Sequence, residues 1–94
     1  MGMTLAELLR GVVAGSVTEA QFTENFFRLL RSRGSSDVEA ECLDELVEDV
    51  NMSEHMGELF DKGFVWRCEE CLRLLSEGRS ASEIRRFFGT NTAP

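Results

Sequence analysis

Residues 4–15, TLAELLRGVVAG, carry the start, body and end signals of one helix. Thr4 and Glu7 have the spacing of a capping box, in which each side chain accepts a hydrogen bond from the backbone N–H of the other. Apolar residues then recur at the three- and four-residue intervals that define one helical face: Leu5, Leu8, Leu9, Val12 and Val13. Gly15 is the residue type that most readily ends a helix. The stretch therefore predicts a short amphipathic helix.

The same signals for the start and end of a helix recur along the chain. Capping-box pairs stand at Thr18/Gln21, Ser36/Glu39 and Ser80/Glu83. They predict helices within residues 18–34, 36–50 and 80–89. Gly34 is expected to end the first of these helices and Gly89 the last. A further helix is expected from residue 64 or 65 to 77, before Gly78, and residues 51–63 are expected to be a connector with at most one helical turn beginning at Ser53. The predicted fold class is all-α: a small antiparallel four-helix bundle with a short extra C-terminal helix.

The apolar face of each predicted helix supplies the expected core. Beyond the first helix the inward residues are expected to be Phe22, Phe26, Leu29, Leu30, Cys42, Leu43, Leu46, Val47, Val50, Val65, Cys68, Cys71, Leu72, Leu75, Ile84, Phe87 and Phe88. A chain of 94 residues is long enough for one domain only. We expect a single helical domain at residues 1–89 and a flexible tail at 90–94.

Length and composition also indicate where in the cell the protein is located. No apolar run reaches the length needed to cross a bilayer, and the N-terminus lacks the basic and apolar stretches of a secretion signal. The three cysteines are an odd number, which is typical of reduced thiols inside the cell. We therefore expect a cytoplasmic protein with no membrane association.

The charge of the chain is concentrated in one segment. The chain has 17 acidic and 10 basic residues, a formal net charge of -7. Residues 37–61 contain ten of the acids and no lysine or arginine, which leaves seven acids and all ten bases elsewhere, a balance of +3. Like charges three or four residues apart on a helix destabilise it by a few tenths of a kcal/mol per pair, roughly. Such a concentration is not what helix stability alone favours.

Two interpretations of this acidic segment are open. It is either a solvated face that keeps a small protein soluble, or a docking surface for a strongly basic partner. In the second case we expect partner binding from Glu41, Asp44, Glu45, Glu48, Asp49, Glu54, Glu58 and Asp61. Trp66 is either a residue of the core or its edge or, if it is exposed beside Asp61, an apolar anchor of the interface. On the third helix Glu41, Asp44, Glu45 and Glu48 are expected opposite the apolar stripe. Direct binding of nucleic acid is disfavoured, because its affinity comes mainly from lysine and arginine on phosphates.

Motifs for metal or redox chemistry are weaker. Cys68 and Cys71 have CxxC spacing, and Cys42 and His55 could complete a set of zinc ligands. However, all three cysteines fit apolar helix faces, where a free thiol behaves as a small hydrophobic group. His55 is the only histidine and has no recognisable nucleophile beside it. We expect no metal, no cofactor and no enzymatic activity.

Several short motifs resemble colicin D-type immunity proteins. They are Val17-Thr18-Glu19-Ala20-Gln21-Phe22 between the first two helices, Glu45-Leu46 within the acidic helix, and Asp61-Lys62-Gly63-Phe64 leading to Leu72. The resemblance covers residues 4–76, and residues 79–94 have no counterpart in it. The acidic connector is also shorter than in that family.

The resemblance implies an inhibitor of a bacterial toxin. Such immunity proteins bind the nuclease domain of a bacteriocin or contact-dependent toxin, which for colicin D-type toxins cleaves transfer RNA. It implies that the acidic face occupies the cationic cleft as a nucleic-acid mimic, as a monomer in a 1:1 complex with a basic toxin nuclease domain. The alternative is a small helical adaptor or regulator that binds a partner helix, or a second copy, through an apolar face that could include Phe87 and Phe88.

Overall fold

The computed structural model describes residues 3–33, 36–56 and 58–92, and the side chains of all of these except 53–56. Within this part of the chain all regular structure is helical, and the predicted all-α fold class is confirmed. The helices are α1 (Leu5–Ala14), α2 (Glu19–Ser32), α3 (Asp37–Met56), α4 (Lys62–Ser76) and α5 (Ala81–Thr90).

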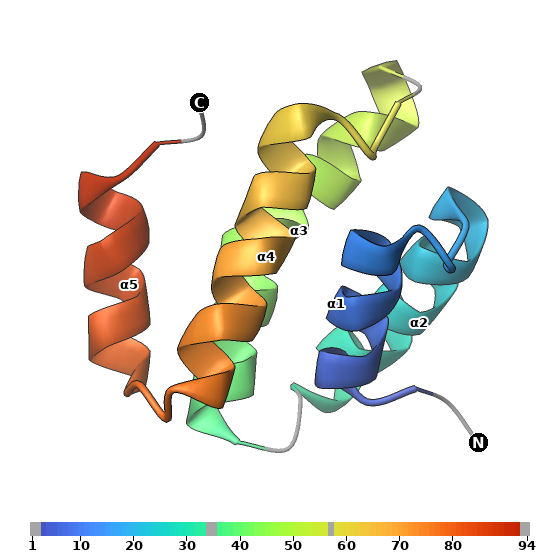
Figure 1. The fold of residues 1–94 in the computed structure, drawn as a ribbon. Coiled ribbons are helices and arrows are strands. Elements are labelled where there is room, and N and C mark those ends of the chain that lie inside the picture. The colour runs from blue at the N-terminus through green and yellow to red at the C-terminus, as the bar shows by residue number, and fades with distance from the viewer. Residues whose placement is uncertain (1–2, 34–35, 57, 93–94) are drawn as a thin grey trace.

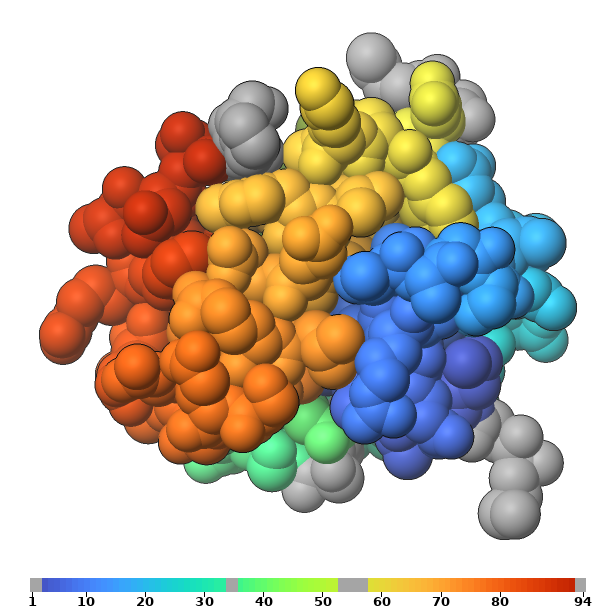
Figure 2. Space-filling model, viewed as in Figure 1, coloured from blue at the N-terminus to red at the C-terminus, as the bar shows by residue number. Residues whose placement is uncertain are grey.

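Successive helices run in opposite directions (Figure 1). α4 packs against α1 and α3, α2 packs against α1 and α3, and α5 packs on α3. On the face shown in Figure 2, α4 lies between α1 and α5. The Cα radius of gyration is 12.2 Å, which matches the value of about 12 Å expected for a compact chain of this length.

The predicted capping residues fix the helix starts. Thr4, Thr18 and Ser80 each form a complete capping box with the residue three positions later. Ser36 Oγ accepts from the backbone N–H of Glu39 at 3.2 Å. Gly15 ends α1 in the left-handed conformation, with φ of 74°. These local signals were readable in the sequence because a cap involves only residues within one helical turn.

Three predicted helix boundaries are wrong, and a fourth falls outside the described residues. α3 continues through residues 51–56, where a connector was expected, and α4 begins at Lys62 rather than at residue 64 or 65. Gly89 lies inside α5 rather than ending it. At the end of α2, Arg33 adopts the left-handed conformation with φ of 60°, while the predicted stop, Gly34, lies outside the described residues.

The core follows the predicted apolar faces with a few exceptions. Leu59, in the segment before α4, is buried, although it was expected in a connector and not in the core. Val13 is 44% exposed, although it was expected to face inward, and Leu74 is buried, although it was not. Phe22 is completely buried at the centre of an aromatic group, where its ring centroid lies 5.5 Å from Phe26, 5.9 Å from Phe60 and 5.3 Å from Phe64. This group joins α2 to the start of α4 and to the connector before it.

Gly11 has a packing role that the sequence analysis did not identify. It is buried in α1, and a Cβ at this position would lie in hard contact with Cγ2 of Val17. The turn after α1 can therefore fold back onto the helix only where position 11 has no side chain. Gly89, in contrast, faces open space in α5.

The two glycines provide a matched test. We expect Gly11→Ala to lower the free energy of unfolding by about 1 kcal/mol, because overpacking costs more than the gain in helix propensity. Gly89→Ala is expected to raise it by about 0.5 to 1 kcal/mol, because only the propensity changes. Urea denaturation of both variants measures the difference. Equal effects of the two substitutions would contradict the packing role of Gly11.

Candidate functional site

The acidic residues of α3 form two columns with different surroundings. Glu41, Glu45 and Asp49 recur every four residues on the side of the helix that approaches α4 and α5. Asp44 and Glu48 form the second column, which is exposed. The expectation that Glu41, Asp44, Glu45 and Glu48 lie opposite the apolar stripe is therefore only partly right.

The expected exposure of Glu41 is wrong. Its side chain is buried, with 7% of the residue exposed, because α5 packs over this part of α3. Its Oε1 accepts a hydrogen bond from Arg85 of α5 at 2.8 Å. The Arg85 side chain itself is 71% exposed. Glu41 thus holds α5 in place, and its carboxylate is not free for a partner.

Glu45 and Asp49 are half-buried and carry perturbed carboxyl groups. Partial burial, followed by a hydrogen bond with Glu41 and repulsion from its charge, raises the pKa of Glu45 above its ordinary value. Burial is also the first cause that raises the pKa of Asp49, and Asp61 and Glu48 add to it. Arg67 opposes this shift and lies 3.4 Å from Asp49. A further cation nearby would stabilise the ionised form of both carboxyl groups.

Asp44 and Glu48 face solvent without an ion pair among the described residues. Two other predicted members of the acidic surface, Glu58 and Asp61, are exposed in the segment before α4. Glu54 and His55 belong to α3, but their side chains lie outside the described residues. The acidic surface that the structure describes therefore consists of the exposed residues Asp44, Glu48, Glu58 and Asp61 and the half-buried Asp49.

The segment before α4 is held in place by two carboxylates. Glu19 of α2 accepts hydrogen bonds from the backbone N–H groups of Leu59 and Phe60 at 3.1 and 2.9 Å. Asp61 is the N-cap of α4, and its Oδ1 accepts from the N–H of Phe64 at 2.8 Å. The role of Glu19 was missed, because its partners lie 40 and 41 residues away and no local pattern marks them. Glu58 and Asp61 are thus displayed on a fixed backbone.

Trp66 is brought close to Asp61. Both line a shallow hollow of about 430 Å³ together with Phe60, Lys62, Val65 and Glu69. Trp66 is half-buried, and its ring lies 6.0 Å from Phe87 and 6.1 Å from Phe88 between ring centroids. The hollow combines an indole edge with carboxylates, which is a combination suited to a cationic side chain.

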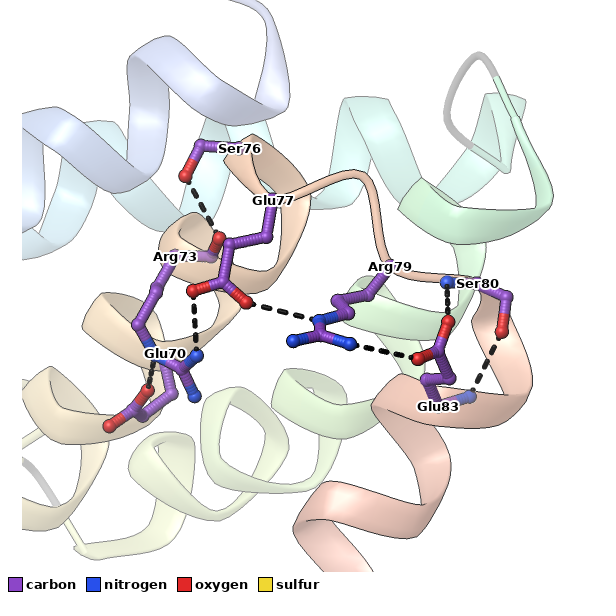
Figure 3. A network of polar contacts seen from close by, with 7 residues as sticks. All are labelled: Glu70, Arg73, Ser76, Glu77, Arg79, Ser80 and Glu83. Atoms are coloured by element: carbon purple, nitrogen blue, oxygen red, sulfur yellow. Dashed lines mark hydrogen bonds and ion pairs between the residues drawn. The ribbon is translucent and has the colours of Figure 1, made fainter.

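The turn between α4 and α5 contains an ion-pair network that is separate from the acidic surface (Figure 3). Arg73 donates to Glu70 at 2.6 Å and to Glu77 at 3.0 Å, and Arg79 donates to Glu77 at 3.0 Å and to Glu83 at 3.1 Å. These arginines are matched by acids of their own region. They therefore do not neutralise the carboxylates of α3.

The cysteines belong to the core. Cys42, Cys68 and Cys71 are free thiols with no exposed surface. Burial raises the pKa of the Cys68 thiol, and contact with Cys42 followed by burial raises that of Cys71, so neither forms a reactive thiolate at neutral pH. In the described part of the chain, no group of three His, Cys, Asp or Glu side chains is placed to hold a metal ion.

The comparisons with known proteins are negative. No protein-family model, curated protein or solved structure matches this chain. The likeness to colicin D-type immunity proteins therefore rests on the short motifs alone. Among the described residues, no helix combines the length and apolar character needed to cross a membrane.

The half-buried carboxyl of Glu45 makes a pH-dependent prediction. Because its folded-state pKa is raised, its charge destabilises the folded protein as the pH rises through that pKa. We expect Glu45→Gln to raise the free energy of unfolding at pH 7 by a few tenths of a kcal/mol, roughly the size of one like-charge pair. The gain should disappear below the ordinary glutamate value of 4.5, where Glu45 is protonated in both states.

Urea denaturation at pH 7 and pH 4 measures this effect. Glu24→Gln is the control, because Glu24 is an exposed glutamate on α2. A stabilisation by Glu45→Gln that persists unchanged at pH 4 would contradict the electrostatic cause.

Proposed function

We propose that this protein is an immunity protein that binds and inhibits a bacterial nuclease toxin domain of the transfer-RNA-cleaving type. Its acidic surface acts as a nucleic-acid mimic in the cationic cleft of the toxin. The observation that carries this proposal is the segregation of charge: residues 37–61 hold ten acids and no base. Asp44, Glu48, Glu58 and Asp61 of that segment are exposed.

The geometry of the acidic surface supports this role. A nuclease places lysine and arginine where phosphates bind, and exposed carboxylates can pair with the same cations. The fixed backbone around Glu58 and Asp61 reduces the conformational entropy lost on association. The Trp66 hollow offers an aromatic anchor beside these charges. On this proposal the protein performs no chemistry, requires no cofactor and acts in the cytoplasm as a monomer in a 1:1 complex.

The raised pKa values of Glu45 and Asp49 also favour a cationic partner. A positive side chain nearby would lower both pKa values, so binding would release protons at weakly acidic pH. Among the described side chains, the large apolar residues that are exposed are Val13 on α1 and Met52 on α3, and scattered apolar side chains of this kind are normal on protein surfaces.

The direct test is protection from a toxin. The gene next to that of this chain is examined for a toxin with a basic C-terminal domain, and that domain is expressed with and without the present protein. We expect growth to be rescued only by co-expression, and the purified pair to form a 1:1 complex whose affinity falls steeply with salt. Failure to protect would overturn the proposal. Binding unaffected by high salt would instead favour an adaptor that uses an apolar face.

A further inference from the structure

α5 has fewer buried residues than α1, α2 or α4. Ile84 is its only buried residue, while Phe87 and Phe88 are half-buried. It packs on α3 and stands at the edge of the fold, away from α1 and α2 (Figure 1). Elements with few buried side chains open at a lower free energy than the core of the same protein. We therefore expect α5 to open at a lower free energy than the rest of the fold.

The surface beneath α5 is both acidic and aromatic. α3 contributes Glu41, which is buried by α5, and Glu45, which lies one turn further along. α4 contributes Trp66, whose ring stacks on Phe87 and meets Phe88 edge-on. α4 also contributes Arg67 and Arg73, which lie over the rings of Phe88 and Phe87, but both already form ion pairs with acids outside α5. Removal of α5 would thus open a groove between α3 and α4 with carboxylates on one wall and an indole on the other.

The side chains of α5 complement the surface beneath it, but they supply too few positive charges for its carboxylates. Its sequence places Arg85 and Arg86 between the apolar residues Ile84 and Phe87. Of these two arginines only Arg85 forms an ion pair in the described part of the chain, and it does so with Glu41. Glu45 gains no arginine from α5 at ion-pair distance. A helix with arginines at more positions would match this groove better than α5 does.

We propose that α5 is a displaceable arm, and that the groove it covers between α3 and α4 binds an arginine-bearing amphipathic helix of the nuclease partner. This inference rests on the proposed function, because it assigns a second, covered site to the same cationic partner. Gly78, with φ of 73°, adopts in the turn the left-handed conformation that glycine takes without strain. The capping box of Ser80 and Glu83 lies within α5 itself, so the arm can move as an intact helix.

The experiment uses the full chain and a synthetic probe with the chemistry of the arm. The probe is a fluorescein-labelled peptide of residues 79–92. Arg85→Glu removes the ion pair with Glu41 and places two negative charges together, which should release the arm. Arg86→Glu is the matched control, because it makes the same charge change on the same helix without breaking an ion pair in the described structure.

The expected result is at least tenfold tighter peptide binding by Arg85→Glu than by the unmodified chain or by Arg86→Glu. Hydrogen exchange of residues 81–90 should accelerate in Arg85→Glu alone, with exchange in α1 to α4 unchanged. Adding Glu41→Gln and Glu45→Gln to Arg85→Glu should weaken peptide binding again, since these carboxylates would hold the arginines of the probe.

Equal peptide binding by all variants would overturn the inference, as would exchange of the arm between two copies in a dimer of the unmodified chain. The result is independent of the toxin. If the toxin domain is bound and neutralised but Arg85→Glu gains no affinity for the peptide, only the arm is refuted. If the groove opens and binds peptide but no toxin is neutralised, the proposed function fails by itself.

Discussion

The double variant Asp44→Lys/Glu48→Lys is expected to bind the toxin domain at least 100-fold more weakly and to lose protection. Both side chains are exposed on α3, so each substitution replaces an attraction with a repulsion against the cationic cleft. Juxtaposed like charges in an interface cost several kcal/mol, and about 2.7 kcal/mol corresponds to a 100-fold change in Kd. Calorimetric titration and survival under co-expression measure the effect.

A matched control separates location from total charge. Ala14→Lys/Ala20→Lys/Glu24→Lys makes the same change in net charge at exposed positions on α1 and α2, outside both the acidic segment and the Trp66 hollow. We expect it to retain protection and to lower affinity only slightly, through the screened long-range field. The test variant and the control should both keep the helical circular dichroism of the parent. Full protection by Asp44→Lys/Glu48→Lys would refute the acidic surface as the binding site.

The largest loss of stability is expected from Phe22→Ala. Phe22 is completely buried and contacts three other phenylalanine rings. Truncation of a buried phenylalanine costs about 3 to 5 kcal/mol, and the total stability of a small domain is only about 5 to 15 kcal/mol. We therefore expect the midpoint of urea denaturation to fall sharply, and the variant to be partly unfolded at physiological temperature.

Phe27→Ala is the control for this substitution. Phe27 is on the same helix and meets Phe26 at 5.9 Å between ring centroids, but it is only partly buried. We expect a loss less than half that of Phe22→Ala, because less of the ring leaves water on folding. Equal losses would show that the aromatic group is not organised around Phe22.

The fold was predictable where its determinants are local. The boxes that begin with Thr4, Thr18 and Ser80 were readable because both partners lie within four residues. The end of α3 was not, since residues 51–56 contain no strong cap or apolar stripe, and the sequence there resembles a connector. Gly63 also misled the prediction, because the N-cap that starts α4 is Asp61, two residues earlier.

The candidate site was predictable in composition and less so in geometry. Counting charges located the acidic segment without any structure. The sequence could not show that Glu41 is buried, because this depends on where α5 packs, and residues 79–94 offered no resemblance to guide its placement. An anchor role for Trp66 depended on its exposure beside Asp61, and the structure places it in one hollow with Asp61 but half-buried.

The packing of α1 against α4 has a consequence for synthesis on the ribosome. Leu5, Leu8 and Leu9 are made first, yet α4, a main partner of their helix, is made only after residue 61. In a nascent chain in which α1, α2 and α3 have emerged but α4 has not, part of the apolar surface therefore stays uncovered. Chaperone binding to the nascent chain should be strongest in this interval and should end as α4 emerges. Completion of the core late in translation makes early termination products of this protein targets for proteolysis.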